Sequence, residues 1–182
     1  MPDKNKLKEL VAATQPHINL REAVIEKDYY VTQVIHAISG ITNEYFRLVF
    51  CGGTCLAKAH KIVDRMSEDI DFKIQLKKTD VNLSKTQLLK ELKAFRSQIK
   101  SNLSRSDLII GEPVVRNEGR YSRIELNYSS FFPAGTALRP HILLEFTLSN
   151  IRLAVDSLSI RTIIEDHLKN VTLFASSSTL CV

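Results

Sequence analysis

The sequence is poor in the residues that mark fibrous and disordered chains. Its 182 residues include only six glycines and five prolines, whereas 44% are apolar and 25% are charged. Collagen-like chains are much richer in glycine and proline, and disordered chains are poorer in apolar residues, so this composition indicates an ordinary globular protein. There is no internal repeat, and no low-complexity tract is long enough to serve as a linker.

Long apolar runs are also absent. No stretch approaches the roughly 18 to 20 consecutive apolar residues that a membrane-spanning helix requires. The N-terminal sequence MPDKNKLKEL carries charges with no apolar signal core behind them. A cytoplasmic location is therefore the expectation.

Cysteine and histidine are few and scattered. The cysteines are Cys51, Cys55 and Cys181, an odd number, and the spacing of the first two matches no common zinc or redox motif. Buried free thiols are therefore expected in place of a disulfide framework. The five histidines have no metal-ligand spacing, and Cys51 is interpreted as a packed residue, not as a nucleophile.

Acidic residues are outnumbered, but only slightly. Lysine and arginine number 25 against 20 aspartates and glutamates, which gives a net charge of +5. Such an excess favours a polyanionic partner only weakly. Many basic side chains gather on and around one predicted helix, where they either attract an RNA backbone or keep the helix soluble. They are Lys85, Lys90, Lys93, Arg96, Lys100 and Arg105.

Hydrophobic periodicity predicts helices that alternate with strands. Helical spacing of apolar residues appears over 22–40, 84–103 and 157–169, with another helix expected over 54–62. Asn19 with Glu22, and Ser84 with Gln87, match helix start signals. Strands are predicted over 45–50, 69–76, 124–128 and 142–148. Because the last three strands separate a polar from an apolar face, we expect an α/β or α+β sheet covered mainly on one side.

A pair of carboxylates lies at the start of the predicted strand over 69–76. Asp69 and Asp71 are two positions apart, so both project from the face opposite Ile70 and Phe72. Neighbouring like charges repel unless a cation lies between them, and Mg²⁺ prefers carboxylate oxygens. The pair is therefore either a divalent-metal site or a solvated acidic edge.

The pair Gly52-Gly53 ends the strand over 45–50 and precedes a helix. A tight turn at such a point presents backbone N–H groups and a positive helix end to an anion such as a phosphate. An isolated glycine pair is more often a plain turn. Next to a carboxylate pair on the following strand, it indicates that phosphate and metal meet at one place.

A third carboxylate, Glu145, interrupts the apolar strand HILLEFTL. An acid in so apolar a strand needs a partner. It either pairs with a basic residue, Arg123 or Arg139, or joins the two aspartates as a metal ligand or general base. Glu125 on the preceding strand is the competing candidate.

The run CGGTCLAKAHKIVDRMSEDIDF, from Cys51 to Phe72, resembles the signature of the AbiEii/AbiGii family of nucleotidyltransferase-like toxins, a branch of the DNA polymerase β-type superfamily. The superfamily pattern is Gly followed by Gly or Ser, then a spacer, then Asp, an apolar residue and Asp or Glu. Here fifteen residues separate Gly53 from Asp69. The segments EKDYYVTQVI (26–35) and LRPHILLEF (138–146) are similar to the family's first helix and to the strand that supplies its third carboxylate.

The resemblance implies a nucleotidyltransferase-like mixed β-sheet flanked by helices. It implies a metal-dependent enzyme that transfers a nucleotide from a nucleoside triphosphate to an acceptor such as tRNA. It also implies a toxin of a type IV toxin–antitoxin or abortive-infection system, with a cognate antitoxin encoded nearby.

Two sets of residues follow from the resemblance. The carboxylates that would act in catalysis and hold Mg²⁺ or Mn²⁺ are Asp69, Asp71 and Glu145. The residues that would contact the nucleotide are Gly52, Gly53, Thr54, Lys58, Arg65 and Ser67. The last three are alternatively parts of a solvated helix and loop.

The resemblance also bears on domain organisation. One nucleotidyltransferase-like domain is expected over 1–182, with its core at about 20–150 and the start of a helical C-terminal part at 151–182. Family members commonly continue into a helical domain with a further lysine-containing motif, which this sequence lacks, so a truncated or minimal form is expected. The alternatives to an active toxin are a catalytically silent nucleotide- or RNA-binding module and a metal-dependent nuclease. The nuclease is disfavoured because it would not need the glycine turn.

Overall fold

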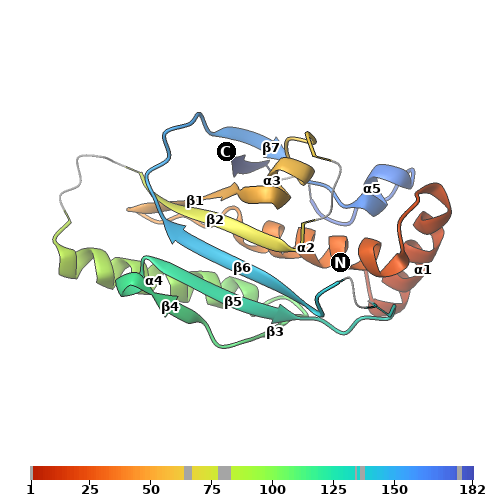
Figure 1. Ribbon diagram of the computed structural model, residues 1–182, viewed down its shortest axis with the longest axis horizontal. Helices are drawn as coiled ribbons and strands as arrows, with labels where there is room; N and C mark the ends of the chain where they lie inside the picture. The colour runs from red at the N-terminus through yellow and green to blue at the C-terminus, as the bar shows by residue number, and fades with distance from the viewer. Residues whose placement is uncertain (1, 64–66, 78–82, 134, 136–137, 176–177) are drawn as a thin grey trace.

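Strands pair into one mixed β-sheet, and helices pack against it (Figure 1). The computed structural model describes residues 2–63, 67–77, 83–133, 135, 138–175 and 178–182. In these ranges the strands are β1 (Phe46–Cys51), β2 (Asp69–Leu76), β3 (Ile109–Ile110), β4 (Val114–Arg116), β5 (Tyr121–Asn127), β6 (His141–Leu148), β7 (Asp156–Ser159) and β8 (Ser178–Cys181). The helices are α1 (Lys4–Thr14), α2 (Glu22–Ile38), α3 (Gly52–Lys58), α4 (Lys85–Leu103) and α5 (Ile163–His167), with 3₁₀ turns η1 (Gln15–His17) and η2 (Asn117–Gly119).

Strands β2 and β6 lie in the middle of the sheet. The strand order is β3-β5-β6-β2-β1-β8-β7, and β4 also pairs with β5. Strand β2 is parallel to β6 and antiparallel to β1. The start of β2 therefore lies beside the start of β6 and the end of β1. The predicted mixed α/β architecture is confirmed.

The two faces of the sheet differ in polarity, as the alternation in the sequence predicts. On β2, Ile70, Phe72 and Ile74 are at most 1% exposed, whereas Asp69 and Asp71 are only half-buried and project from the opposite face. The same alternation runs along β6. The apolar face forms the core, and the other face, which we call the polar face, carries the carboxylates.

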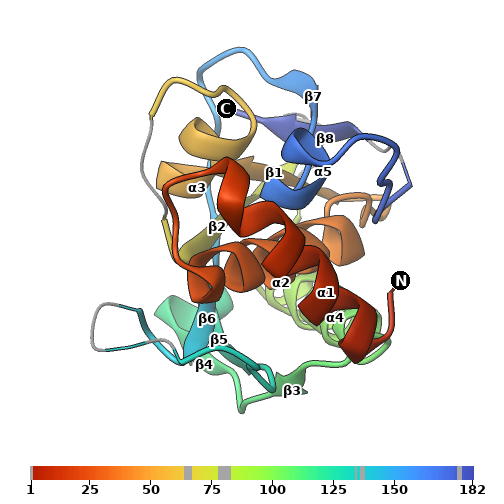
Figure 2. The same ribbon diagram turned by 90° about the vertical axis from the view of Figure 1, so that its right-hand side faces the viewer.

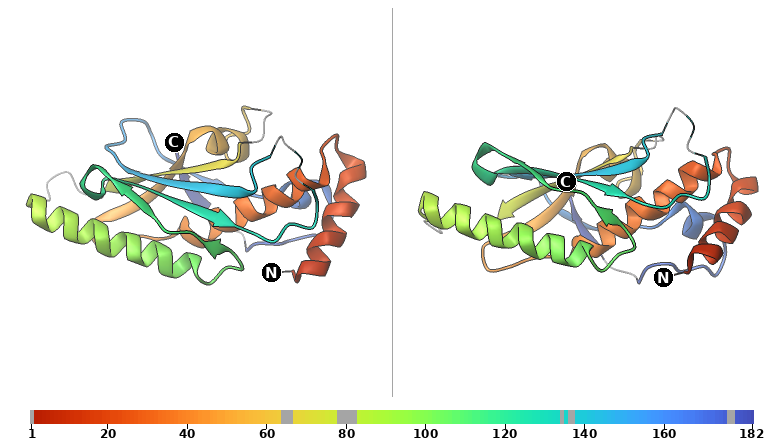
Figure 3. Two further views of the ribbon diagram at one scale, coloured as in Figure 1. Left: turned by 60° about the horizontal axis from the view of Figure 1, so that its bottom comes forward. Right: turned by 90° about the horizontal axis from the view of Figure 1, so that it is seen from below.

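Helices α2 and α4 cover the apolar face (Figures 2 and 3). The rings of Phe46 on β1 and Phe95 on α4 lie 5.5 Å apart. Helix α4 begins as predicted, since Ser84 and Gln87 form a capping box. Helix α2 begins at Glu22, but its N-cap is Arg21 without a side-chain hydrogen bond, so the predicted start signal at Asn19 is wrong.

The chain ends differ most from the prediction. Helix α1 has no predicted counterpart and packs against α2 (Figure 2). The helix predicted over 157–169 is wrong in its first part, because β7 occupies that stretch. Helix α5 begins only after its N-cap Thr162, which forms a capping box with Glu165. Strand β8 pairs in parallel with β1, which places Cys181 beside Phe50. Local periodicity cannot reveal such a strand, since its partner lies more than a hundred residues away in the sequence.

Two expected absences can be compared with the structure. All three cysteines are free, with Cys55 and Cys181 buried and Cys51 half-buried, so the expectation of buried free thiols is confirmed for two of them. Within the described ranges, no helix combines the length and apolar character that crossing a membrane requires.

The contact between α4 and the sheet gives a prediction about stability. Replacing Phe95, which is fully buried, by alanine should lower the free energy of unfolding by about 3 to 5 kcal/mol through lost burial and a residual cavity. The exposed neighbour Lys93 is the control, and its alanine variant should change stability by less than about 0.5 kcal/mol. Urea denaturation measures both values, and equal effects would contradict the placement of α4.

Candidate active site

Strands β2 and β6 place two carboxylates side by side on the polar face. Asp71 is the direct partner of Glu145 in the parallel register. Burial first, and then the charges of Glu145 and Asp69, raise the pKa of Asp71 above its usual value. Glu145 accepts a 3.0 Å hydrogen bond from the Tyr121 hydroxyl. Among the described residues, neither Asp71 nor Glu145 has an ion pair with a lysine or arginine, so this pair of like charges is uncompensated.

Gly52 fits closely against the same carboxylate. Its φ is +77°, and a Cβ built on it would lie 2.3 Å from Oδ2 of Asp71. An L-residue at this position would be strained by its backbone and would also displace the carboxylate. The glycine turn at the start of α3 and the carboxylates of β2 therefore belong to one site.

A cavity of about 740 Å³ opens over these groups. Asp71, Glu145 and Gly52 line it together with two cations, Lys73 and Arg152. Neither cation was predicted from the sequence, although Lys73 follows Asp71 at the same-face spacing of two residues, a signal that could have identified it.

The thiol of Cys51 also lines this cavity. Burial and the charge of Asp71 raise the pKa of Cys51 to about 11. The residue is therefore a neutral thiol at physiological pH and a poor nucleophile. This agrees with its interpretation as a packed residue.

Asp69, the third predicted carboxylate, has a partner of its own. The Arg139 guanidinium lies 2.8 Å from Oδ1 of Asp69. Arg139 was a possible partner of Glu145, and it binds the other carboxylate instead. Arg123 lies opposite Glu145 in the register of β5 and β6, but no ion pair joins the two in the described part of the chain.

A buried lysine fixes the backbone around Asp69. Lys27 on α2 is 0% exposed, and its ammonium group donates to the Glu68 carboxylate and, at 2.8 Å, to the Arg139 carbonyl. The same Glu68 carboxylate accepts from the Arg139 N–H at 2.8 Å. Burial lowers the pKa of Lys27, an effect that Glu68 opposes. This network was not predicted from the sequence, because nothing in a helical lysine indicates a partner 41 positions away.

The donor chemistry of the site fits a hard divalent ion, although the cluster is incomplete as it stands. No three Asp, Glu, His or Cys side chains in the described ranges already form a metal-binding group. Asp71 and Glu145, however, present oxygen donors in register with no cation between them, which is the donor type that Mg²⁺ selects. Asp69 would complete a three-carboxylate set only after leaving Arg139.

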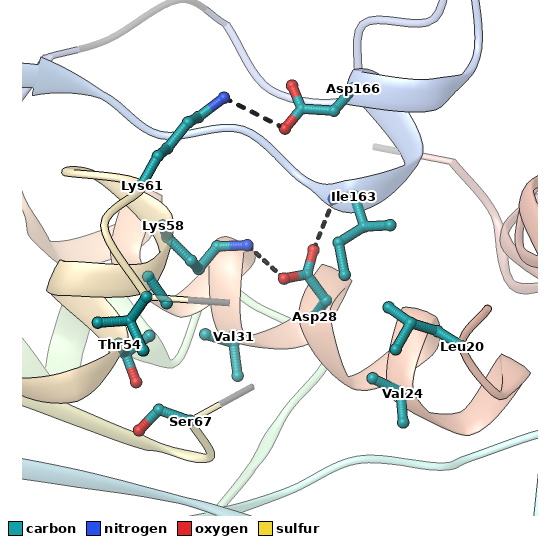
Figure 4. A pocket seen from close by; sticks show the side chains of 12 residues that line it. Leu20, Val24, Asp28, Val31, Thr54, Lys58, Lys61, Ser67, Ile163 and Asp166 are labelled. Atoms are coloured by element: carbon teal, nitrogen blue, oxygen red, sulfur yellow. Dashed lines mark hydrogen bonds and ion pairs between the residues drawn. The ribbon is translucent and has the colours of Figure 1, made fainter. Parts of the chain in front are cut away.

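The predicted nucleotide contacts fall into two pockets. Gly52 lines the carboxylate cavity, and Gly53 follows it in the first turn of α3. Thr54, Lys58 and Ser67 line a second pocket of about 390 Å³ between α2, α3 and α5 (Figure 4). Arg65 lies outside the described residues.

In this second pocket Lys58 is already paired. Figure 4 shows its ammonium group pointing at Asp28 on α2, which also accepts a 2.8 Å hydrogen bond from the backbone N–H of Ile163. The Thr54 hydroxyl donates to the backbone carbonyl of Asp69. Thr54 therefore ties the first turn of α3 to the start of β2.

The basic residues of α4 do not surround the site. Phe95 of α4 packs on Phe46, on the face of the sheet opposite Asp71. The exposed side of α4, which carries Lys93 and Lys100, therefore lies across the sheet from the carboxylates. Figure 3 shows the ribbon of α4 along one side of the sheet. An RNA bound at both places would have to pass around an edge of the sheet.

The fit of Gly52 against Asp71 predicts the outcome of a small substitution. Gly52→Ala should lower the free energy of unfolding by about 1 to 2 kcal/mol, because an L-residue with positive φ is strained, and should also displace the Asp71 carboxylate. Gly40→Ala is the control, since a Cβ there meets no atom within 4 Å. Thermal unfolding of both variants measures the difference, and a Gly52 variant as stable as the control would contradict this geometry.

The raised pKa of Asp71 predicts a pH dependence of stability. The ordinary pKa of this carboxyl is 3.8, and its pKa in the folded protein is higher. Between these two pKa values the folded protein binds more protons than the unfolded protein. The stability that this group contributes is therefore lost as pH rises through this range. Asp71→Asn cannot ionise and should therefore raise the melting temperature at pH 7 in a chelating buffer, with little change at pH 3. Glu125→Gln, at an exposed carboxylate, should change neither value, and an Asp71→Asn protein less stable than wild type at pH 7 would overturn this assignment.

Comparisons with known proteins identify a family and a similar fold. A family model described as nucleotidyl transferase AbiEii toxin, type IV toxin–antitoxin system, matches residues 44–181. Among solved structures, the fold is similar to MenT4, the nucleotidyltransferase toxin Rv2826c from Mycobacterium tuberculosis H37Rv, with a TM-score of 0.58 and 17% sequence identity. That match covers 96% of this chain and 54% of the other, so the chain spans about half the length of MenT4. The sequence matches none of the curated proteins with which it was compared.

The match to the family model extends over most of the chain and includes every strand of the sheet. Both β2 and β6, with their carboxylates, and the glycine turn at α3 lie within it. The chain therefore belongs to the AbiEii family of nucleotidyltransferase toxins of type IV toxin–antitoxin systems.

Proposed function

We propose that this chain is a metal-dependent nucleotidyltransferase that moves a nucleotide from a nucleoside triphosphate to an RNA acceptor such as tRNA. The observation that carries the proposal is the uncompensated pair of Asp71 and Glu145, in register on β2 and β6, with Gly52 packed against it. Two carboxylates held together without a cation repel each other, which disfavours the fold, and they offer the oxygen donors of a divalent-metal site.

Asp69, Asp71 and Glu145 would hold the metal ion, Mg²⁺ or Mn²⁺. When bound, the ion would supply Lewis-acid stabilisation of the charge that develops on the phosphates. An acceptor hydroxyl oxygen forms a bond to the α-phosphorus, and the bond from that phosphorus to pyrophosphate breaks. Glu145, oriented by the Tyr121 hydroxyl, either completes the carboxylate set or accepts the proton of the hydroxyl.

The glycine turn would contact the phosphates. Gly52 and Gly53 have no side chains, so they leave room for a phosphate to approach the backbone N–H groups of the turn. The backbone N–H of Thr54 would contact the phosphate as well. Lys58, Arg65 and Ser67 remain proposed contacts beyond the turn. Lys58 would first have to leave Asp28, to which it is paired.

The acceptor would enter through the cavity over the polar face. Its volume of about 740 Å³ suits a nucleotide together with the end of a second substrate, and Lys73 and Arg152 on its walls suit a phosphate backbone. The partner in the cell would be the antitoxin that the family implies. A catalytically silent nucleotide- or RNA-binding module is the second candidate, favoured by the ion pair that already neutralises Asp69.

Labelling of RNA tests the proposal. Protein incubated with Mg²⁺, one of the four α-³²P-labelled nucleoside triphosphates and bulk tRNA should transfer label to the RNA. Asp69→Ala and Asp71→Ala should reduce labelling to background, because each removes an oxygen donor from the metal. Glu125→Ala, at an exposed carboxylate on β5 that does not line the cavity, should label RNA as wild type does.

The other outcomes separate the alternatives. Labelling that survives both aspartate substitutions would reject the proposed site. Nucleotide binding without transfer would indicate the silent module. Shortened RNA without label would indicate a nuclease.

A further inference from the structure

We propose that Arg139 is an internal counter-ion that neutralises Asp69 before substrate binds and then moves to the phosphates of the incoming nucleotide. This inference rests on the proposed function, because it assigns a new substrate contact in the same site. Neither the sequence pattern nor the comparisons assign this role to Arg139.

The ion pair has the properties of an exchangeable contact. The Arg139 and Asp69 side chains are 53% and 40% exposed, and their closest atoms are 2.8 Å apart. An ion pair this exposed contributes little to stability, so its loss costs the fold little. Of the three proposed metal ligands, Asp69 alone has a cationic partner among the described residues. A metal ion and the guanidinium would compete for the same carboxylate.

The backbone of Arg139 is held independently of its side chain. Its N–H donates to Glu68 and its carbonyl accepts from Lys27, both at 2.8 Å. The anchoring lysine is fully buried. The guanidinium can therefore leave Asp69 by rotation about side-chain bonds while the peptide stays in place.

The phosphates of a bound nucleotide would give the released guanidinium a new anionic partner. Asp69 and Asp71 would hold the metal ion that binds the phosphates, and the Arg139 guanidinium already lies 2.8 Å from Asp69. A planar guanidinium binds phosphate oxygens with two parallel hydrogen bonds, which an ammonium group cannot reproduce. Binding of metal and nucleotide would thus exchange one ion pair for another without leaving a charge unpaired.

Opposite effects on two ligands test this exchange. Free Mn²⁺ measured by electron paramagnetic resonance gives the metal affinity without nucleotide. Arg139→Ala should bind Mn²⁺ about two- to fivefold more tightly than wild type, because the competing cation is gone. Calorimetry with Mg²⁺ and the four α,β-methylene nucleoside triphosphates, which cannot undergo transfer, gives the nucleotide affinity. The same variant should bind its preferred analogue about tenfold more weakly.

Two variants serve as controls. Arg161→Ala removes a matched arginine, 52% exposed and 3.2 Å from Asp166, and should leave both affinities unchanged. Arg139→Lys keeps the charge but not the planar fork, so it should bind Mn²⁺ as wild type does and bind the nucleotide more weakly. Glu68 accepts from the backbone N–H of Arg139, and Lys27 donates to its backbone carbonyl. Because neither bond involves the side chain, both Arg139 variants should keep the wild-type melting temperature to within a few degrees.

Three other results would reject the counter-ion role, the transfer to phosphate or the metal site. Mn²⁺ affinity that is unchanged or weaker in Arg139→Ala rejects the counter-ion role. Tighter Mn²⁺ binding with unchanged nucleotide affinity rejects the transfer to phosphate. If Mn²⁺ binds wild type and Asp71→Asn equally, or binds neither, the metal site of the proposed function fails, and this inference fails with it.

Discussion

The parallel pairing of β2 with β6 is the constraint on which the site depends. Backbone hydrogen bonds and the burial of Ile70 and Phe72 fix the register of these strands, and that register leaves Asp71 beside Glu145. A slip of one residue would send these side chains into the core and the apolar ones into solvent. Burial of the apolar face therefore holds two like charges together, because separating them would require the strands to lose their register.

The sheet divides stability and chemistry between its faces. Helices α2 and α4 bury the apolar face, and the polar face carries the carboxylates, the glycine turn and the cavity. Because α4 packs on the face of the sheet opposite the carboxylates, its basic surface is separated from the site. The proposed function uses the polar face and leaves the surface of α4 without an assigned role.

Lys27 connects the two layers. It extends from α2 to Glu68 and to the carbonyl of Arg139, at the points where β2 and β6 begin. A buried ion pair of this kind contributes little net stability, but loss of one partner leaves a buried charge. Its value is geometric, because it fixes the backbone on both sides of the Asp69 carboxylate while leaving the Arg139 side chain able to move.

The sequence alone determined the elements whose signals are local. Alternation identified β2 and β6, the Ser84–Gln87 capping box identified the start of α4, and the spacing of Asp69 and Asp71 put both on one face, because each signal arises within a few residues. Tertiary structure decided which partners meet. The pairing of Asp71 with Glu145, of Arg139 with Asp69 and of β8 with β1 joins residues 70 or more positions apart. Such contacts depend on strand order and register, which leave no trace in local periodicity.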